Sequence, residues 1–269
     1  MRNIIGQQAG AAAGDSHPSS VLGKAFLLFG AFDGGRSTLG LTDLSRRAGI
    51  PKATAYRLAQ ELVNLNLLER VEAGYQLGWR MYELGQLVPG PANLRHVARP
   101  VLTDLHSATR AVVHLAVPHG LDTLYLERLA GRSDARVHAT VGNRIPMWCT
   151  ASGKLFIAYS DDPERILSAL EHDGAPHRTG GGPTAGRLRA QIAAVRDRRW
   201  ATEQQECLEG YKSYAVPITS GGPHQVVAAV SATLPIGRRD DQQVIRALWT
   251  AAALVSRTME ESTLATLAG

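Results

Sequence analysis

Residues 41–64 read LTDLSRRAGIPKATAYRLAQELVN, and this stretch decides the fold of the N-terminal part of the chain. Its apolar spacing predicts a short helix that Thr42 caps and Gly49 ends, because glycine enters the left-handed region without a Cβ penalty. Pro51 suits the first turn of a second helix, since its missing N–H would be unpaired there anyway. The pattern carries this helix to about Asn64. The residues expected to face inward are Leu41, Leu44, Ala48, Ile50, Ala55, Leu58, Leu62 and Leu65.

The flanking sequence adds a helix before this pair and a hairpin after it. A helix is expected over 20–33, with Ser19 or Ser20 as its N-cap. Strands are expected over 67–71 and 75–78, joined by a turn. The apolar stripe of the helix over 20–33 comprises Val21, Ala25, Leu28, Phe29 and Phe32. This order of elements is that of a winged helix-turn-helix domain over residues 20–80. In such a domain the second helix of the helix-turn-helix pair, here the one that runs to about Asn64, enters the major groove of DNA.

The residue types near the start of the second helix suit contact with DNA. Lys52 can neutralise a phosphate, and Arg57 can reach a phosphate or a guanine edge. Thr54 is short enough for a backbone oxygen or a thymine methyl group. The candidate DNA-binding residues are Thr42, Lys52, Ala53, Thr54, Tyr56, Arg57 and Arg70. Two alternatives stay open: a small helical domain with a solvated charged face, and a winged helix used for protein contact.

Composition sets broader limits on the whole chain. Its 269 residues are enough for two domains, and a net charge of +5 makes an anionic partner plausible without establishing one. Residues 1–19 are read as a flexible tail, because they lack the apolar core of a signal peptide. Cys149 and Cys207 have no CxxC spacing, and no HExxH pattern occurs, so neither a metal site nor a cofactor is expected. With no membrane-length apolar run, a cytoplasmic protein is expected.

A helical connector is expected between the two domains. Trp79, Tyr82, Leu84 and Leu87 continue a helical pattern until Pro89-Gly90-Pro91 interrupts it. A linker helix is assigned to 81–92, followed by a helix over about 92–109. The sequence leaves open whether the connector packs against a partner chain or against its own domain.

Residues 93–265 read as an α+β domain with an antiparallel sheet. A sheet of this kind can be covered on one face and leave a cavity on the other. Gly180-Gly181-Gly182-Pro183 is read as a linker, because it lacks the strand and lysine of a phosphate-binding loop. Strands are expected over 112–117, 123–130, 137–141, 200–205, 213–219 and 225–233, and helices over 150–159, 163–171, 187–198 and 239–261.

Several blocks together resemble the IclR-type transcriptional regulators. The DNA-reading segment 41–58 is followed by Tyr75-Gln-Leu-Gly78, which resembles the family's wing closure. The blocks 141–146, 150–154, 210–217 and 227–231 resemble its effector-domain signature, in the family's order and spacing. The resemblance implies a winged helix, a helical linker and a GAF-like effector domain. It also implies a homodimer or tetramer acting as repressor or activator at double-stranded DNA operators near catabolic genes.

The resemblance further implies a small effector, an organic acid or an aromatic metabolite. Ala151 and Ser152 fall at a helix start, where backbone N–H groups favour a carboxylate. Glu203 stands where the family often has aspartate, and Ser213 where cysteine is common. The full set of candidate effector-binding residues is Met147, Cys149, Ala151, Ser152, Glu203, Ser213, Ser231 and Thr233.

The same residues admit plainer interpretations. Ser231 and Thr233 can be satisfied interior residues of a strand, and Glu203 can be a solvated charge at a strand end. An enzyme that turns over a small acid is the rival function, with Cys149 as nucleophile and His114 or His138 as base. Because no surrounding motif supports that constellation, no catalytic residue is assigned. His114 and His138 stand in strand patterns and are expected to be core or pocket residues.

Overall fold

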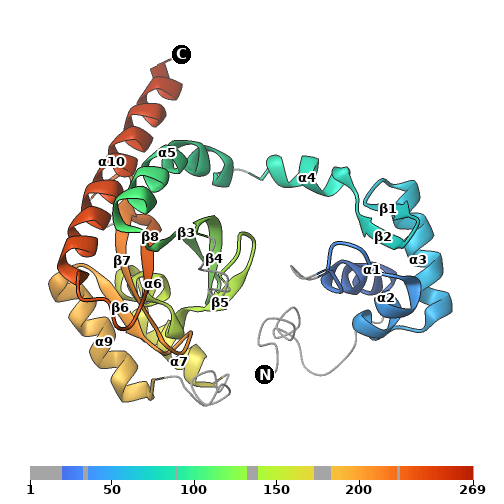
Figure 1. Ribbon diagram of the computed structural model, residues 1–269, viewed down its shortest axis with the longest axis horizontal. Helices are drawn as coiled ribbons and strands as arrows, with labels where there is room; N and C mark the ends of the chain where they lie inside the picture. Colours follow the sequence, from blue (N-terminus) through green and yellow to red (C-terminus); the bar gives the residue numbers. More distant parts are fainter. Residues whose placement is uncertain are drawn as a thin grey trace. The chain divides into compact units, whose positions relative to one another are not determined.

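A computed structural model describes residues 20–32, 36–88, 90–131, 139–172, 183–222 and 225–268. The chain divides between residues 89 and 90 into two compact units. Each unit is drawn in Figure 1 and is described by itself below. The expected tail 1–19, His138 and Gly180 to Gly182 lie outside the described residues.

The first unit has the predicted order of elements. It comprises α1 (Val21–Gly30), α2 (Leu41–Ala48), α3 (Lys52–Asn64), β1 (Leu68–Val71), β2 (Gly74–Leu77) and α4 (Trp79–Gln86). Ser20 caps α1 by accepting a hydrogen bond from the N–H of Gly23, and Gly49 ends α2 with φ 67°. The expectation that Thr42 caps α2 is wrong. The helix begins at Leu41 with Gly40 as its N-cap, two residues earlier than predicted, so Thr42 lies in the first turn.

The core of the first unit lies between α1, α2, α3 and the hairpin. Leu28, Leu44, Leu58 and Leu68 are buried there. Two predicted core residues are exposed instead, Val21 at 58% and Leu65 at 62%. Both stand at helix ends, Val21 at the first residue of α1 and Leu65 at the C-cap of α3, where little neighbouring structure can cover them.

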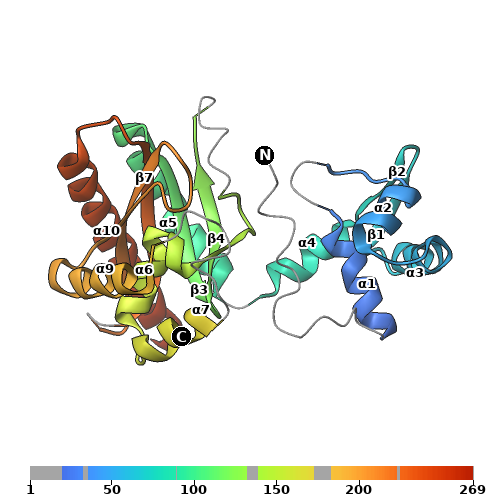
Figure 2. The same ribbon diagram turned by 90° about the horizontal axis from the view of Figure 1, so that it is seen from below.

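The wing is a short antiparallel hairpin joined to the helices. β1 pairs with β2 from Leu68 opposite Leu77 to Val71 opposite Gly74. Tyr75 also exchanges two backbone hydrogen bonds with Leu39, each 2.9 Å long. This bridge ties the wing to the segment that enters α2, and Figure 2 shows the hairpin beside α2 and α3.

The second unit is built on one antiparallel sheet. Its described strands are β3 (Val112–His119), β4 (Asp122–Leu129), β5 (Arg144–Pro146), β6 (Ala201–Gln204), β7 (Tyr211–Thr219) and β8 (Val226–Pro235). Their order across the sheet is β5-β4-β3-β8-β7-β6, so β3 and β8 lie at its centre. Together with its helices, the sheet confirms the predicted α+β class with an antiparallel sheet.

Helices cover both faces of this sheet. The helices α5 (Pro91–Thr109) and α10 (Asp241–Ala268) pack on one face around Leu102, Leu115 and Leu248. The 3₁₀ helix η3 (Met147–Cys149) and the helices α6 (Ala151–Tyr159), α7 (Pro163–His172) and α9 (Ala185–Arg198) form a second apolar cluster on the other face. Figures 1 and 2 show α6 lying against the sheet with α9 outside it.

The expected strand over 137–141 is not found where the structure describes it. Residues 137 and 138 lie outside the described part, and residues 139–141 lead into a turn at Gly142, which has φ 85°. The short strand β5 at Arg144–Pro146 pairs with β4 instead. Within the described residues, no helix is both long and apolar enough to span a lipid bilayer.

Candidate functional site

The start of α3 presents a polar face to solvent. Ala55, Leu58, Ala59 and Leu62 face the core, so the residues between them point outward. This periodicity is the reason that the basic and hydroxyl side chains stay available. Lys52, Ala53, Tyr56 and Arg57 are exposed, Thr54 is half-buried, and Thr42 is exposed in the first turn of α2.

Side-chain contacts hold this face in place. The hydroxyl of Ser45 donates to the carbonyl of Ile50 over 2.6 Å, which fixes the turn between α2 and α3. The amide of Gln60 donates to the hydroxyl of Tyr75 over 3.2 Å, joining α3 to the wing. The exposed guanidinium of Arg70 lies 5.7 Å from the centre of the Tyr75 ring. Arg70, the candidate DNA-binding residue of the wing, therefore lies beside Tyr75, which is itself hydrogen-bonded to α3.

The second unit contains a cavity of about 60 Å³ between the sheet and the start of α6. That volume exceeds what one water molecule needs several times over. The lining residues are His114, Tyr125, Ala139, Ile145, Thr150, Ala151, Ser152, Glu203, Cys207, Leu208, Ser213, Ser231 and Thr233.

Strand register explains why the polar lining residues meet. His114 on β3 lies opposite Ser231 on β8, and Ser213 on β7 lies opposite both Thr233 on β8 and Glu203 on β6. Because directly opposed residues of antiparallel strands point to the same face, these side chains form a band across one side of the sheet.

The Glu203 end of the band is hydrogen-bonded within the protein. Its carboxylate accepts from the hydroxyl of Ser213 over 2.6 Å and from the N–H of Glu206 over 3.1 Å. The hydroxyls of Ser213 and Thr233 lie 3.1 Å apart. Burial raises the pKa of Glu203, and the two hydrogen bonds to its carboxylate oppose that rise.

The opposite wall of the cavity is the first turn of α6. Thr150 is the N-cap, and its hydroxyl accepts from the N–H of Gly153 over 2.9 Å. The N–H groups of Ala151 and Ser152 precede the first intrahelical hydrogen bond. A Cβ at Gly153 would lie 2.3 Å from the carbonyl oxygen of Met147, so only glycine lets α6 approach η3 this closely.

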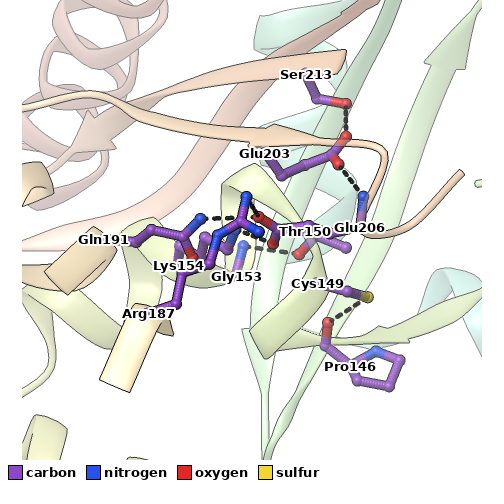
Figure 3. Close-up of polar contacts among 10 residues, drawn as sticks. All are labelled: Pro146, Cys149, Thr150, Gly153, Lys154, Arg187, Gln191, Glu203, Glu206 and Ser213. Carbon is purple, nitrogen blue, oxygen red and sulfur yellow. Dashed lines mark hydrogen bonds and ion pairs between the residues drawn. The ribbon is translucent and has the colours of Figure 1, made fainter. Parts of the chain in front are cut away.

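A buried ion pair lies directly behind this turn (Figure 3). Lys154 and Glu206 form a short contact between side chains that are 0% and 3% exposed. The carboxylate of Glu206 also accepts from the amide of Gln191 over 2.8 Å, and a guanidinium nitrogen of Arg187 lies 3.5 Å away. Burial lowers the pKa of Lys154, and the charge of Glu206 opposes that shift. The pair anchors the turn between β6 and β7, which brings Cys207 and Leu208 to the cavity.

Six of the eight candidate effector-binding residues line this cavity, and two do not. Met147 and Cys149 are buried in η3, in the apolar cluster that packs around α6. The thiol of Cys149 donates to the carbonyl of Pro146 over 3.3 Å. Interaction with the Cys207 side chain and burial hold the pKa of Cys149 well above its usual value, so the thiol stays protonated and is a poor nucleophile.

Seven lining residues are not among the candidate effector-binding residues predicted from the sequence. They are His114, Tyr125, Ala139, Ile145, Thr150, Cys207 and Leu208. The strand pattern around His114 did predict an interior or pocket position for it. The register that sets it opposite Ser231 depends on pairing across 117 residues, which local sequence patterns do not report.

Comparison with known proteins identifies this architecture. Residues 88–257 match the model of the bacterial transcriptional regulator IclR C-terminal domain, and residues 21–72 match the IclR helix-turn-helix domain. The fold thus defines a DNA-binding transcriptional regulator with a separate effector-binding domain. The chain belongs to the IclR family of bacterial transcriptional regulators.

Individual relatives agree over most of their length. The chain is 30% identical to the HTH-type transcriptional regulator XynR of Escherichia coli, over 82% of this chain and 88% of the relative. It is 27% identical to KdgR of the same organism, over 91% of this chain and 95% of the relative. A crystal structure of an IclR homologue from Microbacterium hydrocarbonoxydans, complexed with 4-hydroxybenzoate, matches with a TM-score of 0.80 and 26% identity. That match covers 90% of this chain and all of the other.

Proposed function

We propose that this regulator binds specific operators through α3 and the wing, and that a small organic acid or aromatic effector in the cavity modulates that binding. The observation that carries the proposal is the exposed face at the start of α3, where Lys52, Tyr56 and Arg57 lie beside Thr54. The proposed targets are catabolic genes. The proposed location is the cytoplasm, because the chromosomal DNA of bacteria lies there.

The roles proposed on DNA follow from side-chain chemistry. Lys52 pairs with a phosphate, which adds affinity without sequence preference. Arg57 contacts a guanine edge or a phosphate, while Thr54, Tyr56 and Ala53 fit against backbone and base edges in the major groove. Thr42 and Arg70 contact the flanking DNA backbone from α2 and the wing. Together these contacts supply both the affinity and the sequence preference that an operator-binding protein needs.

The proposed effector site is the cavity itself. The free N–H groups of Ala151 and Ser152 suit a carboxylate, because a helix N-terminus carries a partial positive charge. Ser213, Ser231, Thr233 and Glu203 supply hydroxyl and carboxylate groups on the sheet side. That a related protein of similar structure binds 4-hydroxybenzoate supports an acid of that size as a probe. The ligand regulates only if it binds one arrangement of the dimer better than the other.

Filling the cavity is expected to abolish effector binding. Ser231→Leu places a branched apolar side chain in the middle of the polar band, where Ser231 is 4% exposed. We expect calorimetry with 4-hydroxybenzoate, benzoate, lactate and propionate to show affinity for at least one acid in the wild type. The variant should lose about tenfold or more of that affinity, since a filled pocket cannot bury the ligand.

Thr250→Leu is the matched control, because Thr250 is exposed on α10 and distant from the cavity lining. Circular dichroism checks that both variants fold. Equal acid affinity in the wild type and Ser231→Leu would place the effector site elsewhere and contradict the proposal.

A homodimer, alone or paired into a tetramer, is the proposed assembly. Trp79 and Tyr82 of α4 are 73% and 63% exposed, and Leu87 at its C-cap is 76% exposed. No described residue of this helix is buried. Val21, Leu22 and Phe26 of α1 are also exposed. Large apolar side chains concentrated on two helices are typical of a protein–protein contact surface. We propose that a second copy of the chain covers this surface, because a palindromic operator has two half-sites and each is read by one helix-turn-helix unit.

The double variant Tyr82→Glu/Leu87→Glu is expected to dissociate this dimer. Two charges in an apolar interface leave uncompensated buried carboxylates, which oppose association strongly. Light scattering after size-exclusion chromatography should give twice the monomer mass or more for the wild type and the monomer mass for the variant. Leu254→Glu, on the exposed side of α10, is the control and should keep the wild-type mass. A variant with the wild-type mass would refute the proposed interface.

A further inference from the structure

His114 is a buried polar side chain without a hydrogen-bond partner in the described part of the chain. It is 1% exposed, it lines the cavity, and neither Nδ1 nor Nε2 has a partner at hydrogen-bond geometry there. Buried polar groups are nearly always paired, because losing water without a replacement costs free energy. A polar ring left open toward a cavity therefore points to something that the cavity holds.

The ring is held in one orientation by its neighbours. The Tyr125 ring meets it edge-on, with centroids 5.1 Å apart and planes inclined at 67°. Ser231 lies opposite it on β8, and Arg128 lies opposite it on β4. Such packing leaves the imidazole little freedom to seek a partner by rotating, so the partner must come to it.

The protonation state decides which partner fits. Burial, reinforced by the positive charge of Arg128, lowers the pKa of His114 to about 3, although the Ala139 backbone, in contact with the ring but outside hydrogen-bond geometry, opposes the shift. The imidazole is therefore neutral near pH 7, with one N–H donor and one acceptor nitrogen. A carboxylate would satisfy only the donor. A hydroxyl both donates and accepts, so it suits whichever ring nitrogen faces it.

A second unpartnered group marks where the acid end lies. The hydroxyl of Ser152, in the first turn of α6, is 1% exposed, lines the same cavity and has no hydrogen-bond partner among the described residues. It stands beside the free N–H groups that favour an anion. By contrast, Glu203 at the edge of the band already accepts two hydrogen bonds. The open positions are thus an anion site at Ser152 and a neutral site at His114.

We infer that the cavity selects hydroxy acids: the carboxylate lies at Ser152 and the start of α6, and a hydroxyl of the same molecule pairs with His114. This inference rests on the proposed function, because it takes the cavity to be the effector site. His114 is then the residue that distinguishes a hydroxy acid from the same acid without the hydroxyl. A ligand lacking the hydroxyl displaces the water that would satisfy the ring and puts nothing in its place.

Matched pairs of acids test the inference on the full-length protein. Calorimetry compares 4-hydroxybenzoate and 3-hydroxybenzoate with benzoate, and lactate with propionate. In at least one pair the wild type should bind the hydroxy member about tenfold or more tightly, because a site built to hydrogen-bond a hydroxyl rejects the analogue without it. In His114→Leu the preference in that pair should fall to about threefold or less. In His114→Asn it should persist, since an amide also offers a donor and an acceptor.

His96→Leu is the control, because His96 is exposed on α5, and it should keep the wild-type preference. Imidazole ¹⁵N resonances give a second readout that needs no variant: His114 should stay neutral, and its signals should shift with the hydroxy acid and not with its partner. Three results would overturn the inference: no hydroxyl preference in any pair, an undiminished preference in His114→Leu, or protonation of His114 on binding. If none of these acids binds, the inference falls together with the proposed effector site; if acids bind without the preference, it falls alone.

Discussion

Lys154→Met is expected to lower the free energy of unfolding of the effector domain by about 3–5 kcal/mol, the range measured when one partner of a buried ion pair is removed. The substitution leaves the carboxylate of Glu206 buried, with Gln191 and the more distant Arg187 as its contacts. It also releases the turn between β6 and β7 from α6. Urea denaturation followed by circular dichroism measures the change.

A second substitution separates charge burial from lost packing. In Lys154→Met/Glu206→Gln no buried charge is left alone, so most of the lost stability should return. Arg257→Met is the matched control at an exposed pair, since Arg257 and Glu261 are 69% and 68% exposed. Its cost should stay within about 1 kcal/mol. A loss in Lys154→Met no larger than in Arg257→Met would show that the buried pair is not an anchor.

Arg57→Ala is expected to weaken operator binding by roughly 10- to 100-fold, the loss typical of removing one arginine contact to a base. Arg57 is exposed on α3, and its neighbours Ala55, Leu58 and Ala59 carry the packing of the helix. The variant should therefore fold normally and bind the effector as the wild type does. Fluorescence anisotropy with a labelled operator fragment measures the loss of affinity, and calorimetry measures the retained acid binding.

Arg246→Ala removes the same charge from the exposed face of α10 and serves as the control. It should leave operator affinity unchanged. Lys52→Ala should act differently from Arg57→Ala if Lys52 contacts a phosphate: binding weakens about equally on all sequences, and the salt dependence becomes less steep. Undiminished operator affinity in Arg57→Ala would contradict the proposal that α3 reads the operator sequence through Arg57.

The local elements were predictable because their signals are local. Gly49 ends α2 with the left-handed backbone expected of glycine, and Pro51, expected in the first turn of α3, is its N-cap one residue before. Thr150 caps α6 at the predicted start of that helix. Errors fell at helix ends, such as Thr42 and Leu65, where one residue of shift changes whether a side chain caps, packs or faces solvent.

The candidate cavity was predictable in part, and for a different reason. The resemblance of the sequence to a known family pointed to Ser152, Glu203 and Thr233, which do line one cavity. It also pointed to Met147 and Cys149, which the apolar packing of η3 turns away from the cavity lining. Neither the pairing of Lys154 with Glu206 nor the register that sets His114 opposite Ser231 was predicted. Both depend on contacts between residues distant in sequence, which periodicity does not encode.

The central claim is sequence-specific DNA binding, and selection of fragments from the host's sheared genomic DNA on the purified protein at near-physiological salt tests it most directly. A few intergenic fragments that share a roughly palindromic sequence should be enriched, because paired helix-turn-helix units read two half-sites. Arg57→Ala should recover these fragments poorly. Uniform weak retention that disappears as salt is raised, with and without bound acid, would mean only non-specific attraction of charge and would contradict the account.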